Sequence, residues 1–374
     1  MSDVLAHHRS TTSSPGTARL PGEDDGAAVG ARIESALALF LAAKERAGAT
    51  GGAVPGQLAS VLREFIGSGG KRVRPLLCVL GWRAAGGSGL TRPVVGVAAA
   101  LEMFHVVALI HDDLMDGSAT RRGRPAVHRQ LAERLGAGLP RDRAERLGES
   151  AAILAGDLAL TWSDELLHTS LTPDRLAAVL PLVGAMRAEA VHGQYLDVTA
   201  AGRRAGGVPL ALRIARYKTA TYTVERPLHI GATLAGAPAE LLEGLSAYAV
   251  PTGEAFQLRD DLLGAFGDPD RTGKSAWEDL RDGKHTLLVA LARERATPAQ
   301  ADVLETLLGA PALDEDGVHR LRGVLIDSGA RAEVEHLIAE RRAQALDALD
   351  AMALPSLVAE ELARLTHRAT ARRY

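Results

Sequence analysis

Apolar residues recur at helical spacing along almost the whole chain from about residue 30 onward. Glycine clusters and prolines divide this pattern, since glycine commonly ends a helix and proline is tolerated in its first turn. We expect Pro227 to kink or break the helix that contains it. The pattern predicts helices over residues 31–48, 55–70, from 75 onward, 92–116, 148–170, 173–199, 208–234 and 238–264, then three to five shorter helices up to residue 374.

No run of alternating β-branched residues predicts a sheet, and alanine and leucine dominate the apolar residues, which favours helices. No repeat or linker divides the helical region. We therefore expect an all-α fold, a single large bundle of long helices, over residues 29–374. Residues 1–28 are polar and rich in Ser, Thr, Gly and Pro, without the apolar core of a signal peptide. We interpret them as a disordered leader.

The longest apolar run covers residues 94–110, contains Glu102 and His105, and ends in two aspartates. A membrane span needs about 20 residues with few charges. We therefore interpret this run as a buried helix of a soluble protein and expect no membrane span.

Charge and cysteine content narrow the function further. The 43 basic and 46 acidic residues give a formal net charge of −3, which provides no reason to expect a nucleic-acid partner. The single cysteine, Cys78, excludes an internal disulfide and a cysteine-based zinc site. The chain is thus compatible with the cytoplasm.

A first acidic cluster follows the longest apolar helix, in the stretch "ALIHDDLMDGSATRRGRPAVH". Asp112 and Asp116 are four residues apart and share a helix face with Asp113 beside them. Their repulsion at the negative end of a helix calls for a cation, and Mg²⁺ is a hard ion that takes oxygen ligands and substrate phosphates. The alternative is a solvated acidic turn.

A second acidic pair, Asp260 and Asp261, follows another apolar helix, with Gly264 where a third aspartate would repeat the first pattern. A polar loop after it carries further charges: Asp268, Asp270, Lys274, Asp279 and Lys284. The alternative interpretation is a charged loop with internal salt bridges that contribute little.

Basic residues occur near the acidic clusters and beside a group of glycines. They include the arginines that follow the first cluster, three residues beside the glycines of "GSGGKRVRP", and a lysine with a hydroxyl neighbour in mid-helix: Arg121, Arg122, Lys71, Arg72, Arg74, Lys218 and Thr219. Glycines let an anion approach the backbone, and the helix that follows offers free N–H groups. For the pair at 218 and 219, an exposed helix face is the alternative. Together these features predict a substrate with a diphosphate head and a hydrocarbon tail.

These residues resemble the trans-isoprenyl diphosphate synthases, the family of farnesyl and geranylgeranyl diphosphate synthases. The resemblance extends from about residue 60 to 290 and rests on an ordered set of motifs: "GGKRVRP", "HDDLMDGSATRRGRPAVH", "GQYLD", "KTA", "FQLRDDLLG" and "GK" shortly before a threonine. The resemblance implies a bundle of long helices around a deep central cavity, usually a homodimer.

The resemblance also implies roles for individual residues. About three Mg²⁺ ions would be held by two aspartate motifs, made of Asp112, Asp113, Asp116, Asp260 and Asp261. The allylic diphosphate would contact Arg121, Lys218, Thr219, Lys274 and Lys284, with Gln257 at the border of that site. Isopentenyl diphosphate would contact Lys71, Arg74, His105 and Arg122. Gln194 and Asp197 would face the cavity, and the C-terminal Arg372 and Arg373 would fold over the diphosphates or fray.

The implied reaction is a Mg²⁺-dependent head-to-tail condensation, in which released diphosphate takes the proton and no side chain acts as base. Position 264 departs from the family, whose second motif usually ends in aspartate. Product length would depend on Phe104, Val107 and Ala108. The small residues at 107 and 108 let the tail pass, and the phenylalanine closes the tunnel one turn deeper, which favours geranylgeranyl diphosphate (C20). The alternative is that Phe104 packs into the core.

Three alternatives remain open from the sequence. The chain could be a farnesyl or longer-chain polyprenyl diphosphate synthase. It could be a class I terpene cyclase, although "FQLRDDLLG" is not a cyclase metal motif and "GGKRVRP" would then be idle. It could also be a non-catalytic regulatory subunit of a synthase, an alternative that Gly264 favours and the intact "DDLMD" opposes.

Overall fold

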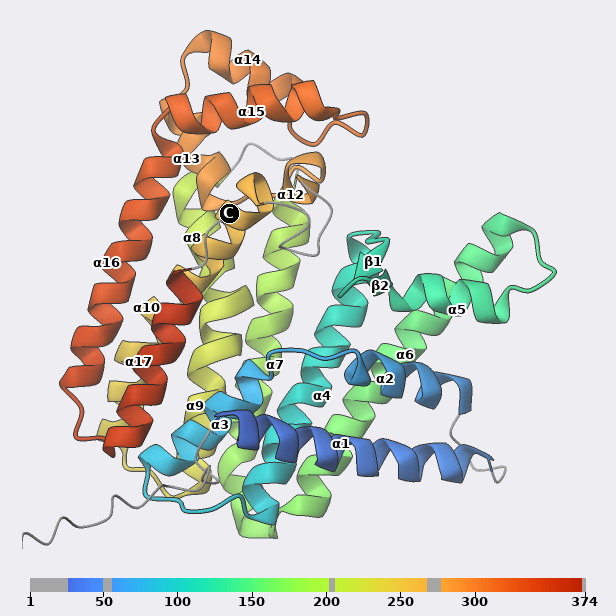
Figure 1. The fold of residues 1–374 in the computed structure, drawn as a ribbon, viewed down its shortest axis with the longest axis vertical. Coiled ribbons are helices and arrows are strands. Elements are labelled where there is room, and N and C mark those ends of the chain that lie inside the picture. The colour runs from blue at the N-terminus through green and yellow to red at the C-terminus, as the bar shows by residue number, and fades with distance from the viewer. Residues whose placement is uncertain (1–25, 50–55, 202–205, 268–276, 372–374) are drawn as a thin grey trace, which may run out of the picture.

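The computed structural model describes residues 26–49, 56–201, 206–267 and 277–371. Almost every element in these residues is a helix, which confirms the predicted all-α class (Figure 1). The helices before residue 267 are α1 (Gly26–Ala49), α2 (Gly56–Gly67), α3 (Val73–Ala84), α4 (Arg92–Met115), α5 (Val127–Leu135), α6 (Arg141–Ser170), α7 (Pro173–Ala200), α8 (Gly207–Ala215), η1 (Arg216–Glu225), α9 (Arg226–Leu234) and α10 (Ala239–Phe266).

The region after residue 276 contains more helices than the three to five predicted for the end of the chain. The described residues include α12 (Glu278–Arg281), α13 (Leu287–Arg295), α14 (Pro298–Leu307), α15 (Glu315–Asp327), α16 (Ala330–Asp350) and α17 (Ser356–Thr370). The prediction was wrong because α12 is a single turn and because only two residues separate α13 from α14 and α15 from α16. It also missed α5 and the first turns of α6, whose residues are mostly polar.

The predicted disruption at Pro227 takes a specific form. The chain runs from α8 through a ten-residue π-helix, η1, directly into α9, so the helix type changes at Arg226 without a loop. Proline has no N–H and its ring clashes with the carbonyl of the preceding turn in a regular α-helix. The wider turns of η1, with their i→i+5 hydrogen bonds, come just before this proline.

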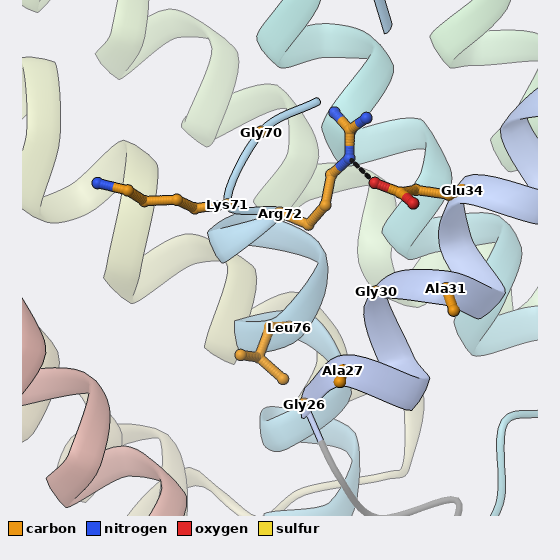
Figure 2. A pocket seen from close by; sticks show the side chains of 9 residues that line it. All are labelled: Gly26, Ala27, Gly30, Ala31, Glu34, Gly70, Lys71, Arg72 and Leu76. Carbon is orange, nitrogen blue, oxygen red and sulfur yellow. Dashed lines mark hydrogen bonds and ion pairs between the residues drawn. The ribbon is translucent and has the colours of Figure 1, made fainter. Parts of the chain in front are cut away.

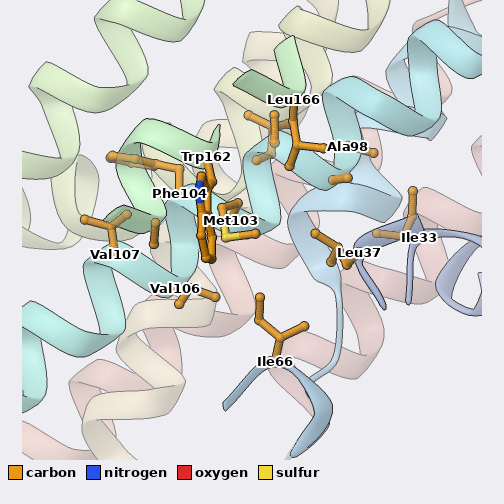
Figure 3. Close-up of a cluster of buried hydrophobic side chains, with 14 of the residues drawn as sticks. Ile33, Leu37, Ile66, Ala98, Met103, Phe104, Val106, Val107, Trp162 and Leu166 are labelled. Atoms are coloured by element: carbon orange, nitrogen blue, oxygen red, sulfur yellow. The ribbon is translucent and has the colours of Figure 1, made fainter. Parts of the chain in front are cut away.

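The long helices α4, α6, α7, α10 and α16 lie lengthwise through the molecule, while α1 to α3 cross one end and α14 and α15 the other (Figure 1). Helix α4 contributes Met103, Phe104 and Val106 to the largest hydrophobic cluster, which also contains Trp162 and Leu37 from neighbouring helices (Figure 3). Burial of this apolar surface is what stabilises the bundle.

Two helices are long and apolar enough to cross a membrane by length and composition: residues 26–48 and 92–115. The second is 78% buried inside the protein across its most apolar window, whereas the first is 22% buried. The first also buries Val29, Ile33, Leu37 and Leu41 against the bundle. Length and composition alone are weak evidence for a span, because core helices pass the same test.

Two glycines let η1 approach its neighbours closely. A Cβ on Gly193 of α7 would lie 2.4 Å from the backbone nitrogen of Lys218, and one on Gly253 of α10 would lie 2.3 Å from the Cα of Ala220. No larger residue fits at either position without moving backbone. The π-helix is therefore held between α7 and α10, which fixes the direction of its polar side chains.

Candidate active site

A cavity of about 1030 Å³ opens among α3, α4, α6, α7, η1 and α10. Its lining includes most of the residues predicted to act on substrate: Lys71, Arg74, Phe104, His105, Val107, Ala108, Asp112, Arg121, Arg122, Lys218, Thr219 and Asp260. Segments from residue 71 to residue 260 are thus brought together around one space, as the predicted site requires.

The first acidic cluster lies at the end of α4, opposite two lysines. Asp112 accepts a hydrogen bond from Lys218 at 3.2 Å, and Asp116 accepts one from Lys284 at 3.1 Å. Lys218 also donates to Asp197 at 2.6 Å. The two carboxylates therefore face the same side, as their helical spacing predicts. The interpretation of this cluster as a solvated turn is wrong, since both aspartates are paired and only partly exposed.

Asp113 points in a different direction from its neighbours. Its side chain is fully buried, and Oδ1 accepts hydrogen bonds from both Nε and Nη2 of Arg121, with the Nε bond at 2.8 Å. Arg121 also lies 3.6 Å from Asp112. The oxygen Oδ2 of Asp113 is buried without a hydrogen-bond partner. Arg121 thus neutralises the carboxylate that the lysines do not reach.

Arg121 and Arg122 belong to a short hairpin that the sequence pattern did not predict. Strand β1 (Thr120–Arg121) pairs antiparallel with β2 (Arg124–Pro125). Arg122 and Gly123, the two residues between them, have φ values of 54° and 72°. Positive φ at both positions is the geometry of a tight two-residue hairpin turn, and it is uncommon for a residue with a Cβ. The turn directs Arg122 back toward the glycine loop, where it donates to the carbonyl of Gly69.

The second acidic pair is divided between the cavity and the interior. Asp260 lines the cavity, whereas Asp261 is buried and accepts a hydrogen bond from Gln257 at 2.7 Å. Gln257 in turn accepts one from the hydroxyl of Thr219. This chain of contacts joins α10 to η1. Thr219 is buried and Lys218 is largely covered, so the interpretation of these two residues as an exposed helix face is wrong.

Gly264 lies against a carboxylate from a later segment. A Cβ at this position would come within 1.8 Å of Oδ2 of Asp279, a residue of α12. Asp279 also pairs with Lys284 at 3.4 Å. The bare backbone at 264 therefore makes room for an aspartate that is distant in sequence. The spacing of residues in the sequence does not predict this contact between positions 264 and 279.

The second set of cations surrounds Tyr222 on η1. Arg74 lies over the Tyr222 ring at 4.3 Å and donates to Thr223 at 2.6 Å. His105 is 3.1 Å from the Tyr222 hydroxyl. Lys71 and Arg122 line the same cavity, and Arg122 is near enough to His105 to lower its pKa. Four groups predicted to share a site therefore come together, and Tyr222, which the sequence analysis missed, organises two of them.

Arg72 plays a different part from the residues on either side of it. Its side chain is 5% exposed and bonds to Glu102 at 2.5 Å, to the carbonyl of Ile66 at 2.6 Å and to Glu34 at 3.3 Å. Figure 2 shows Arg72 directed toward Glu34, while Lys71 extends the opposite way. Arg72 thus fixes the glycine-rich loop to α4, and this explains why the apolar run contains Glu102.

The charges in the site shift one another's pKa. Burial alone would raise the pKa of Asp112, but Lys218, Lys284 and Arg121 together lower it. Burial opposes the effect of the aspartates on Lys218 and Lys284, yet the aspartates raise both lysine pKa values. Asp112, Lys218 and Lys284 therefore keep their charges at neutral pH.

Burial and the nearby Asp279 and Asp260 raise the pKa of Asp261 to about 7, although its bond to Gln257 opposes the shift. Burial and the surrounding arginines hold the pKa of His105 well below 6.5, so its ring is neutral. Burial raises the pKa of Tyr222 to about 12, so its hydroxyl keeps its proton.

The carboxylates fit magnesium in kind and in placement. Among the described residues, no group of three or more His, Cys, Asp or Glu side chains is gathered closely enough to form a ready-made metal site. Mg²⁺ seldom uses such a cage, because it usually binds one or two carboxylates together with waters and substrate phosphates. Asp112 on one wall of the cavity and Asp260 on another offer that arrangement. Asp116, which bonds to Lys284 at the end of α4, and the unpartnered Oδ2 of Asp113 are further oxygen donors.

The predicted chain-length residues line the deeper part of the cavity. Val107 and Ala108 form its wall one turn from Asp112, and Phe104 lies below them. The Phe104 ring packs edge-on against Tyr222 with centroids 5.8 Å apart and is 6% exposed. Phe104 therefore belongs to both the cavity lining and the core (Figure 3), and the two interpretations of this residue are compatible.

Some predicted residues lie outside the described part of the chain: Asp268, Asp270, Lys274, Arg372 and Arg373. Residues 1–25 of the predicted leader also lie outside it, and α1 begins at Gly26, three residues before the predicted domain boundary. Gln194 lines the cavity, and Asp197 reaches the first cluster through Lys218.

An all-α bundle with carboxylates and cations at the mouth of an apolar cavity defines a class of enzyme that handles diphosphates of apolar molecules. Residues 55–324 match the family model described as polyprenyl synthetase. The chain belongs to this family and is a prenyltransferase. The substrates of the family are isopentenyl and allylic diphosphates.

Individual relatives differ in their products. The chain is 32% identical to a geranylfarnesyl diphosphate synthase of Aeropyrum pernix over 74% of this chain and 81% of that one. It is 31% identical to a (2E,6E)-farnesyl diphosphate synthase of Mycobacterium tuberculosis over 80% and 78%. A solved structure of geranylgeranyl pyrophosphate synthase from Corynebacterium glutamicum, complexed with isoprenyl diphosphate and magnesium, has a TM-score of 0.88 and 38% identity, and the match covers 93% of this chain and 100% of that one.

Proposed function

We propose that this chain condenses isopentenyl diphosphate with an allylic diphosphate and releases mainly geranylgeranyl diphosphate (C20). The observation that carries the product length is the position of Phe104, one helical turn below Ala108 and two turns below Asp112 in the cavity wall. One turn rises about 5.4 Å, close to the length of one isoprene unit. Small residues in the first turn and a ring in the second favour a tail one unit longer than farnesyl.

The allylic diphosphate would bind at the end of α4, where Arg121, Lys218 and Lys284 already neutralise carboxylates. Magnesium held by Asp112, Asp113, Asp116, Asp260 and Asp261 would stabilise the charge of the departing diphosphate. Thr219 and Gln257 tie the two walls of this pocket together. Lys274 is part of the same proposal by resemblance.

Isopentenyl diphosphate would bind beside it, where Lys71, Arg74, Arg122 and the neutral His105 surround Tyr222. This places its double bond near the allylic carbon, and positioning of two reactants contributes a large part of a rate enhancement. No side chain acts as the base in this proposal, because the released diphosphate accepts the proton. The aliphatic walls below exclude water, which would otherwise quench the allylic cation.

We also propose a homodimer that works in the cytoplasm. Large apolar side chains on α6 that do not line the cavity are exposed, among them Leu147 at 38%, Ile153 at 48% and Leu154 at 58%. A second copy covering this face would remove them from water. The single cysteine, Cys78, cannot form an internal disulfide, so the chain is compatible with a reducing compartment.

A product assay tests the proposed reaction. Purified protein, Mg²⁺ and isopentenyl diphosphate are incubated with dimethylallyl, geranyl or farnesyl diphosphate, and the products are identified by mass. A dominant C20 product supports the proposal, and a different dominant length overturns the account of Phe104. Cyclic hydrocarbons would indicate a cyclase, and no turnover with any starter would indicate a regulatory subunit.

A further inference from the structure

Three helices, α4, α6 and α7, form the deep end of the cavity, and each contributes one residue per turn. Helix α6 runs antiparallel to α4, since Ser163 donates to the carbonyl of Ala100 while Gly156 lies against His111. Above Phe104, one residue from each of α4, α6 and α7 lines the cavity: Ala108, Leu160 and Ala190. One turn deeper, the same helices carry Phe104, Asp164 and Arg187.

Arg187 joins the other two of these deeper residues. Arg187 donates to Asp164 at 2.6 Å and to Ser163 at 3.0 Å. Its guanidinium lies 5.3 Å from the centre of the Phe104 ring. The Arg187 side chain is 20% exposed and its Nε is buried without a hydrogen-bond partner. A fixed positive charge therefore lies directly behind the phenylalanine.

We propose that Arg187 is a second, charged floor of the tail cavity and sets the upper limit of product length. A tail that passed the position of Phe104 would meet the guanidinium and would have to separate it from Asp164 and from water. Burying an unpaired charge against hydrocarbon is strongly unfavourable. The inference rests on the proposed synthase function and names the residue that limits the length of its product.

The proposal predicts a particular order of effects. Arg187→Met alone leaves the product unchanged, because Phe104 still closes the cavity. Phe104→Ala alone extends the product by about one isoprene unit, the rise of one helical turn. The double variant Phe104→Ala/Arg187→Met extends it further, whereas Phe104→Ala/Arg187→Lys retains the limit because the charge remains. If Arg187 only supported the phenylalanine, its replacement would change nothing in the Phe104→Ala background.

The experiment measures product lengths by mass for the wild type and these variants, with Phe104→Ala/Arg175→Met as a control that removes an exposed arginine of the same helix. A product from the Met double variant at least one unit longer than that of Phe104→Ala supports the proposal. Equal lengths for these two variants overturn it. The wild-type product tests the proposed function separately, because the comparison between variants holds for any starting length.

Binding gives a second measurement if a variant folds but turns over slowly. Calorimetry with geranylfarnesyl diphosphate and Mg²⁺ would show about tenfold tighter binding to the Met double variant than to Phe104→Ala, equivalent to about 1.4 kcal/mol. Equal affinities would overturn the charged floor. Circular dichroism of each variant confirms that the helical fold is present before either measurement.

Discussion

The buried pair of Arg72 and Glu102 provides the sharpest test of how the glycine-rich loop is held. Both side chains are almost fully buried, at 5% and 3% exposure, and their closest atoms are 2.5 Å apart. Replacing one partner of such a pair leaves a buried, uncompensated charge and typically costs about 3–5 kcal/mol of unfolding free energy. Replacing both with apolar residues is often close to neutral.

We therefore expect Arg72→Met and Glu102→Met each to cost about 3–5 kcal/mol. The loss in Glu102→Met falls at the lower end, because Glu34 still lies 3.3 Å from Arg72. The double variant should cost much less than the sum, with a coupling energy of at least about 3 kcal/mol. Urea denaturation of the four proteins measures this cycle. The surface pair Arg146 and Asp142, which is more than 70% exposed on both sides, is the control and should give about 0.3–0.5 kcal/mol.

The same pair should affect one substrate more than the other. Arg72 fixes the loop that carries Lys71 and leads into the first turn of α3, which carries Arg74. Glu102→Gln should therefore raise the KM for isopentenyl diphosphate more than the KM for the allylic starter. Additive stability losses, within about 0.5 kcal/mol, would refute the buried-pair account. Equal rises of both KM values would refute the assignment of the loop to the second diphosphate.

Three further predictions concern His105, Gly264 and the metal. Burial and the nearby arginines hold the pKa of His105 well below the unfolded value of 6.5, so below pH 6.5 the unfolded chain binds a proton that the folded chain does not. In denaturation experiments, wild type should therefore lose about 1 kcal/mol more unfolding free energy than His105→Gln between pH 6.5 and 5.5, and parallel pH profiles would contradict this. Gly264→Asp, which restores the usual third aspartate, should lower activity and raise the Mg²⁺ concentration required, since the new side chain occupies the place of Asp279; higher activity than wild type would show that the contact is unimportant. Chelation of Mg²⁺ should abolish turnover, and Mg²⁺ with inorganic diphosphate should raise Tm in the wild type but much less in Asp112→Asn; an equal rise in both would exclude this aspartate as a ligand.

The parts of the fold set by local spacing were predictable from the sequence. The periodic apolar pattern located α4, α7 and α10, and four-residue spacing placed Asp112 and Asp116 on one face. The assignment of cations to two groups followed from the resemblance, and the structure brings these groups to the same cavity, while their roles stay predictions.

The features that the sequence analysis did not predict depend on contacts between distant residues, which the spacing of apolar residues does not reveal. The hairpin at Arg122 has strands of only two residues, too short for a periodic signal. Asp279 reaches Gly264 because α12 folds back on α10, and a π-helix differs from an α-helix by hydrogen bonding that residue types do not specify. Helix α5 was missed because most of its residues are polar, so its apolar face is narrow.

The π-helix η1 has a consequence for insertions and deletions. Removing one residue from within Arg216–Glu225 would allow the segment to continue as an ordinary α-helix between α8 and α9. The bundle would keep its length, but Lys218 and Tyr222 would rotate relative to the helices that hold their partners. A shortened chain would then fold and still fail to bind either diphosphate. A change of one residue in the length of η1 should therefore alter diphosphate binding without preventing folding. Most substitutions in the core, by contrast, affect both.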